Sequence, residues 1–164
     1  MIIGGDSPYL EVSFRPTVAT ILEARRFVAS LWGPLLGDAD VASRIALATH
    51  ELLENALKYS LDGSTVMRIE LARATMPSTV KVETRNRLSP ERREGLDEIF
   101  EEMNRAGDAL TYYQSAMQRT RTRRHGSGLG LARIWAEAEL SLSHRYEGDE
   151  VRISAKTDLP GVGR

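Results

Sequence analysis

Three polar residues on one predicted helix could line a binding site. Glu51 and Asn55 are four residues apart, and Lys58 follows three residues later, so on a helix all three project from the same side. A carboxylate, an amide oxygen and an ammonium group would therefore line one wall of a pocket. Polar residues with this spacing are also common on solvated helix surfaces, so the trio alone does not define a site.

A second candidate element is a glycine-rich turn far downstream. Gly126, Ser127, Gly128 and Gly130 fall within five residues, and glycine lets a backbone approach a ligand closely or adopt positive φ. A helix is predicted to begin at Leu129, and the N–H groups and positive dipole end at a helix start favour phosphate. Such a turn alone is also typical of an ordinary loop.

The helix that carries the three polar residues is predicted from its apolar residues, which recur at intervals of three and four. They are Ile45, Ala48, Leu52 and Ala56. Asp38 or Asp40 can cap the start of this helix by accepting backbone N–H groups. The turn-forming residues of 61–64 are expected to end it.

The remaining pattern predicts a strand, two helices, two strands, a helical insert, a helix and two strands. Besides the central helix, the expected ranges are 9–15, 17–32, 66–72, 79–84, 89–117, 129–139, 140–146 and 150–156. Gly33 and Pro34 should end the first helix, and Gly107 and Asp108 should break the insert. This order predicts an α+β fold: a two-layer α/β sandwich whose mixed, mostly antiparallel sheet carries its helices on one face.

Length and composition fit one globular domain, since 164 residues with 41% hydrophobic and 27% charged residues can bury a sizeable core. We expect an N-terminal segment at 1–8 and a single domain at 9–157. A helical lid insert is expected at about 89–125, and a C-terminal tail at 158–164.

Charge and cysteine content exclude several classes of function. The net charge of −1 does not indicate a nucleic-acid or membrane partner. The absence of cysteine excludes disulfides and thiolate metal sites, and His50, His125 and His144 lack zinc-ligand spacing. No stretch reaches the roughly 18 apolar residues of a membrane span, so we expect a cytoplasmic protein.

Together, the helix motif and the glycine turn resemble the GHKL superfamily, which includes the nucleotide-binding domains of gyrase, the heat-shock chaperone of the Hsp-ninety type, histidine kinases and MutL. The helix motif of that family is Glu-x-x-x-Asn, which Glu51 and Asn55 match, and its second glycine box begins a helix as Gly126 to Leu131 does. The resemblance covers roughly 10–156. It implies a Bergerat-type fold that binds ATP and Mg²⁺.

The resemblance also implies roles for individual residues. Asn55 would offer its side-chain oxygen to Mg²⁺, which prefers oxygen ligands. Glu51 would orient or deprotonate the attacking nucleophile, and Lys58 would contact phosphate. The residues implied to cradle the phosphates are Gly126, Ser127, Gly128, Leu129 and Gly130.

The adenine end departs from the family pattern. GHKL proteins typically carry Asp-x-Gly-x-Gly after a central strand, whereas here the strand runs into Arg85-Asn86-Arg87-Leu88-Ser89. Asn86 is the best positional substitute for the aspartate, because an amide can both donate and accept hydrogen bonds. Small bacterial regulatory kinases of the SiaB-like type are similar in lacking the full box.

The charged run from Arg119 to Arg124 is predicted to be an exposed loop. Its simplest interpretation is a solvated segment, but it directly precedes the glycine turn. Arg124 is therefore the candidate to reach the phosphates if the loop closes. His50 is predicted to be half-buried, with only a weak claim to catalysis.

Similarity to the anti-sigma-factor serine kinases implies an ATP-dependent regulator that phosphorylates a serine on a small partner protein. The partner would be a STAS-type anti-anti-sigma domain in a bacterial signalling switch. The alternative is a non-catalytic nucleotide-binding or pseudokinase module that sequesters its partner. A homodimer is compatible with either function.

Overall fold

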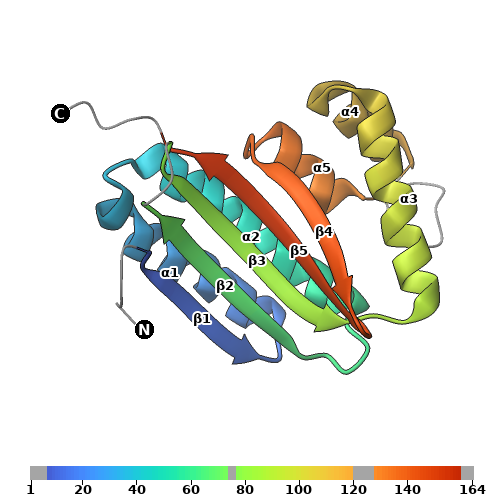
Figure 1. The fold of residues 1–164 in the computed structure, drawn as a ribbon, viewed down its shortest axis with the longest axis horizontal. Helices are drawn as coiled ribbons and strands as arrows, with labels where there is room; N and C mark the ends of the chain where they lie inside the picture. The colour runs from blue at the N-terminus through green and yellow to red at the C-terminus, as the bar shows by residue number, and fades with distance from the viewer. Residues whose placement is uncertain (1–6, 74–76, 120–127, 160–164) are drawn as a thin grey trace.

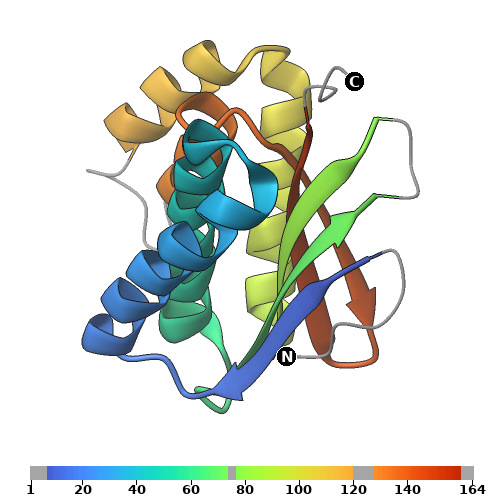
Figure 2. The same cartoon turned by 90° about the vertical axis from the view of Figure 1, so that its left-hand side faces the viewer.

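An antiparallel sheet forms one layer of the protein, and helices packed on one side of it form the other (Figures 1 and 2). The structure, a computed structural model, describes residues 7–73, 77–119 and 128–159. The elements in chain order are β1 (Tyr9–Phe14), α1 (Val18–Leu36), α2 (Ala39–Tyr59), β2 (Thr65–Ala72), β3 (Thr79–Arg87), α3 (Pro90–Ala106), α4 (Ala109–Arg119), α5 (Leu129–Ala136), β4 (Ser141–Glu147) and β5 (Glu150–Asp158).

The strands lie in the order β1-β2-β3-β5-β4, and every pairing among the described residues is antiparallel. β3 is therefore central, with Thr84 opposite Met67 of β2 and Ile153 of β5. Because side chains alternate across a strand, these three residues share the face that meets the helices. The predicted α+β sandwich with a mostly antiparallel sheet is confirmed.

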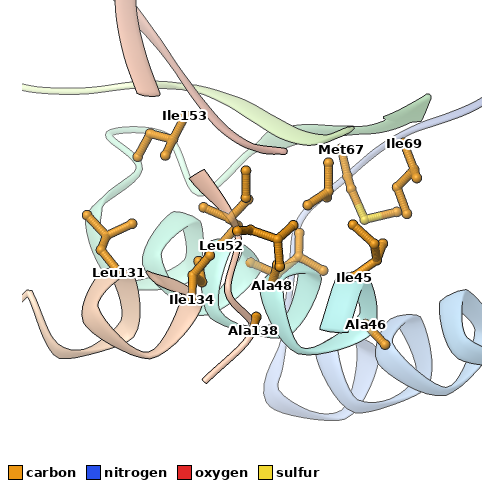
Figure 3. Close-up of a cluster of buried hydrophobic side chains, with 14 of the residues drawn as sticks. Ile45, Ala46, Ala48, Leu52, Met67, Ile69, Leu131, Ile134, Ala138 and Ile153 are labelled. Carbon is orange, nitrogen blue, oxygen red and sulfur yellow. The ribbon is translucent and has the colours of Figure 1, made fainter. Parts of the chain in front are cut away.

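α2 lies at the centre of the core, between the sheet and its neighbouring helices (Figure 3). Its predicted apolar residues are all buried, with Ile45, Ala48 and Leu52 completely so. Burying a side chain the size of leucine contributes about 1.5–3 kcal/mol. The same packing presents the adjacent polar side of α2 to the cavity described below. Further core residues are Met67, Ile69, Leu131, Ile134, Ala138 and Ile153.

The prediction that Gly33 and Pro34 end the first helix is wrong. α1 continues to Leu36 and ends at Gly37, which adopts a left-handed conformation and donates its N–H to the Gly33 carbonyl. Proline removes one helical hydrogen bond and crowds the preceding turn. In the last turn of α1 this cost is offset by burial of Leu36.

Two other boundaries differ from prediction. β3 extends to Arg87, so Asn86 lies within the strand rather than after it. α5 ends at Ala136 instead of continuing to Glu139, and the positive φ of Glu139 is incompatible with an α-helix at that residue. The break at Gly107 is confirmed and separates α3 from α4.

The cap of α2 is Asp38, whose side chain accepts hydrogen bonds from the N–H groups of Asp40 and Val41. This settles the choice between the two predicted capping aspartates. In the part of the chain that the structure describes, no helix is long and apolar enough to cross a membrane.

Candidate functional site

A cavity of about 300 Å³ lies between α2, α3, α5 and the inner face of the sheet. Its wall on α2 contains all three predicted polar residues, Glu51, Asn55 and Lys58. The apolar residues that line it are Leu52, Ala56, Leu88, Leu96, Ile99, Leu129, Leu131, Val151 and Ile153. An apolar interior with a few converging polar groups is the usual character of a small-molecule site.

The start of α5 lies directly against the polar wall of α2. A Cβ atom added to Gly130 would lie 2.9 Å from Glu51 Oε2 and 3.6 Å from Asn55 Oδ1. An alanine at this position would therefore require the Glu51 carboxylate to shift, whereas its distance to Asn55 would be an ordinary van der Waals contact. The helix motif and the described part of the glycine turn, 75 residues apart along the chain from Asn55 to Gly130, thus meet in one site.

Gly128 makes the turn into α5. Its φ is +67°, and an added Cβ would lie 2.7 Å from the hydroxyl of Tyr112 on α4. Ala132 N donates to Gly128 O in the first turn of α5. The N–H groups of Gly130 and Leu131 lie in the same turn, at residues that line the cavity. Gly126, Ser127 and Arg124 lie outside the described residues.

β3 supplies polar groups to the cavity from the sheet. Asn86 and Thr84 are two residues apart on its inner face and are almost fully buried. Asn86 Nδ2 donates to the Arg87 carbonyl at 3.3 Å. In this orientation its oxygen is the group that remains to accept a bond from a ligand.

Arg133 on α5 also lines this site and was not predicted from the sequence. Its Nη1 donates to Glu51 Oε1 at 2.5 Å, and it also contacts Glu137 at 3.4 Å. The only indication in the sequence is that Arg133 is the single charged residue in the apolar run from Leu129 to Ala136. Helical spacing from Glu137 suggests only a surface ion pair, and the contact with Glu51 depends on how α5 packs on α2.

The carboxyl of Glu51 is buried, with 5% of the side-chain surface exposed. Burial raises the pKa of Glu51 above its ordinary value, and the Arg133 guanidinium opposes that rise only in part. A carboxyl with a raised pKa in a cavity is a candidate acid or base. The same carboxylate is paired with Arg133, however, so the basicity of Glu51 depends on that residue.

Lys58 lies at the edge of the cavity with 55% of its side-chain surface exposed, and it donates to Glu54 at 2.8 Å. This hydrogen bond lowers the pKa of Glu54 and raises that of Lys58. His50 lies 3.4 Å from the other oxygen of Glu54 and is half-buried, as predicted. Burial lowers the pKa of His50, which favours the neutral ring at neutral pH.

α3 closes the cavity on the side away from α2. It is attached to β4 through Asp97, which accepts hydrogen bonds from Tyr146 Oη at 2.8 Å and contacts His144 Nε2 at 2.7 Å. Phe100 stacks on the His144 ring with centroids 4.1 Å apart. The adjoining face of the same helix presents Leu96 and Ile99 to the cavity.

Within the described ranges there is no group of three or more histidine, aspartate or glutamate residues placed to hold a metal ion. The predicted metal ligand Asn55 would therefore share Mg²⁺ with ligand oxygens, which is how magnesium is usually bound. The donor set fits such a shared ion. The metal role of Asn55 stays a prediction.

The fold and cavity together define a two-layer α/β sandwich with a site between its central helix and its sheet. No family model matches the chain, and no curated protein does. A chain in the crystal structure of the SiaB–SiaC complex from Pseudomonas aeruginosa has a similar fold, with a TM-score of 0.62. The match covers 90% of this chain and 88% of that chain at 14% sequence identity. At this identity the likeness establishes a shared fold and no more.

Proposed function

We propose that this protein binds ATP with Mg²⁺ and regulates a small partner protein. The convergence of Glu51 and Asn55 with Gly130 around one cavity is the observation that carries the proposal. The cavity has an apolar interior suited to a base and, at the start of α5, N–H groups suited to phosphate. The resemblance of the two motifs to the GHKL superfamily supports the same ligand.

The residues of the site can be assigned to parts of the ligand. Asn55 would bind Mg²⁺ through its amide oxygen, and Mg²⁺ would neutralise phosphate charge. Asn86 would accept a hydrogen bond from the adenine amino group, as the family aspartate does. Lys58 would contact phosphate after leaving Glu54. The phosphate cradle would comprise Gly126, Ser127, Gly128, Leu129 and Gly130, with Arg124 as a further candidate.

The proposed activity is phosphorylation of a serine on the partner, with Glu51 as the base. We take the partner to be a STAS-type domain, as the resemblance to anti-sigma-factor serine kinases implies. The structure with the similar fold comes from a complex of two different proteins, which supports action through a protein partner. A homodimer is compatible with this activity.

A second function is favoured by the ion pair between Arg133 and Glu51. A carboxylate held by a guanidinium is a weaker base than a free one. In addition, the end of β3 carries Asn86 where the family has an aspartate. The protein would then be a non-catalytic nucleotide-binding module that regulates its partner by sequestering it.

Calorimetric titration of Mg-ATP into the wild type and into Asn55→Ala tests the nucleotide site. We expect the wild type to bind and Asn55→Ala to bind about tenfold more weakly or worse, because one ligand to a charged group is lost. Asn104→Ala changes an exposed asparagine of α3 and should bind like the wild type. Absence of binding by the wild type would remove both functions.

Glu51→Gln then separates the two functions. If the protein is a kinase, this variant should retain affinity for Mg-ATP and lose phosphate transfer to the partner. Unchanged transfer would contradict the assignment of Glu51 as the base. Nucleotide binding by the wild type without any transfer would favour the sequestering module.

A further inference from the structure

Four side chains form a hydrogen-bonded chain from α4 to the carboxyl of Glu51. Tyr113 Oη on α4 donates to Glu137 Oε1 at 2.6 Å. The other oxygen of Glu137 accepts from Arg133 Nε and Nη2, each at 3.4 Å. The remaining nitrogen of the guanidinium, Nη1, donates to Glu51 at 2.5 Å. The chain therefore crosses three helices and ends at the candidate base.

Among the described residues, the Arg133 guanidinium is the cation hydrogen-bonded to Glu51. From α2, Glu54 and Lys58 also act on the carboxyl, but Lys58 is hydrogen-bonded to Glu54. Glu137, the residue directly after α5, adds a negative charge that Arg133 partly neutralises. The groups that β3 presents to the cavity, Thr84 and Asn86, carry no charge, whereas α3 lines the same cavity with Glu91 and Arg92.

The geometry leaves Glu51 little freedom. Gly130 of α5 lies against one carboxylate oxygen, and Arg133 of the same helix binds the other. A planar guanidinium fixes the direction of the hydrogen bonds that it donates. The position of α5 thus sets both the orientation of the carboxylate and its nearest charge.

We propose that Arg133 is a positioning residue for Glu51: its hydrogen bond favours the ionised form of the buried carboxyl and aims that group into the cavity. Tyr113 and Glu137 hold the guanidinium in place, so the docking of α4 on α5 controls the charge of Glu51. The use of that charge as a base rests on the proposed function. The control of the charge itself does not, because it follows from contacts within the unliganded chain.

Removal of Arg133 should shift Glu51 towards its protonated form. The carboxyl would stay buried beside Glu54 and Glu137 without its closest cation, and an isolated buried carboxylate is strongly disfavoured. Loss of the Tyr113 hydroxyl should act in the same direction but less strongly. It frees Glu137 to attract the guanidinium away from Glu51 without removing any charge.

Carbon-13 NMR titration of the glutamate carboxyls in the complete, unliganded protein tests this proposal. Arg133→Ala should raise the proton affinity of Glu51 about tenfold or more, and Tyr113→Phe should raise it severalfold. Arg133→Lys, which keeps a charge but not the planar fork, should lie between Arg133→Ala and the wild type. Arg145→Ala, which alters an exposed ion pair of β4, should leave Glu51 unchanged.

A merely structural tie between α2 and α5 would lower stability without moving this titration. An unchanged Glu51 titration in folded Arg133→Ala would therefore overturn the proposal. If Arg133→Ala does not fold, unchanged titrations in both Arg133→Lys and Tyr113→Phe would overturn it instead. No nucleotide is present in these experiments, so their outcome is independent of whether Mg-ATP binds.

Discussion

The arrangement of side chains in this site follows from how closely α5 approaches α2. Gly130 allows α5 to contact Glu51 and Asn55, and Gly128 allows the turn before it to pass under Tyr112. Gly107 adopts positive φ as Gly128 does, but it has no atom within 4 Å of an added Cβ. Gly107 is therefore required only for its backbone conformation, whereas Gly128 is required both for its conformation and because a side chain would not fit.

Gly128→Ala should be more destabilising than Gly107→Ala, because both place alanine at positive φ and only the first also meets a neighbour. Positive φ costs an alanine about 1–2 kcal/mol. At Gly128 the contacts with Tyr112 and Ile99 should add about 1–3 kcal/mol of overpacking. Urea denaturation of both variants measures the difference, and equal losses of unfolding free energy would refute the steric argument.

Sequence reasoning identified the main groups of the site but not the relations between them. Glu51 and Asn55 could be found because helical spacing alone places them on one face. Arg133 could not, since its contact with Glu51 depends on the packing of two distant helices. Asn86 was placed beyond the strand end, whereas in the structure it is a buried residue of β3.

At the level of elements, the buried carboxylate of Glu83 links β3 to β5 on the outer face of the sheet. Glu83 of β3 accepts hydrogen bonds from Ser154 at 2.7 Å and Arg152 at 3.4 Å, and Lys81 lies 3.6 Å away. Burial by itself would raise the pKa of Glu83. The hydroxyl and the two cations outweigh burial, so the pKa is lowered overall.

Ser154→Ala should therefore destabilise the fold at neutral pH and less so in acid. A carboxyl whose pKa is lowered in the folded state contributes stability above its unfolded pKa of about 4.5, and this contribution is lost as pH falls further. We expect a loss of about 1.5–3 kcal/mol at pH 7, as for a hydrogen bond to a charged group.

Chemical denaturation of Ser154→Ala across pH measures this effect. Ser143→Ala is the matched control, because Ser143 lies directly opposite Ser154 on β4 and is exposed. It should change stability little at any pH. A loss in Ser154→Ala that stays constant down to pH 3 would show that the hydroxyl does not act through the ionised form of Glu83.

For the molecule as a whole, the order of elements and the sheet were predictable because apolar periodicity marks each helix and strand. Ile45, Ala48 and Leu52 predicted the central helix, and all three are fully buried. The end of α1 was not predictable from Pro34 alone, because burial of Leu36 favours another turn. Nor could the strand order β1-β2-β3-β5-β4 be read from the chain, since pairing of β3 with β5 depends on distant contacts.

The proposed functions both require that the cavity between α2, α3, α5 and the sheet binds Mg-ATP. Methyl-resolved NMR during titration of Mg-ATP into the wild type tests it most directly. We predict that signals of the cavity residues Ile99, Leu131 and Ile153 shift together with one dissociation constant, while that of Ile21 in α1 stays in place. Shifts confined to residues outside the cavity, or no shifts at all, would contradict the claim.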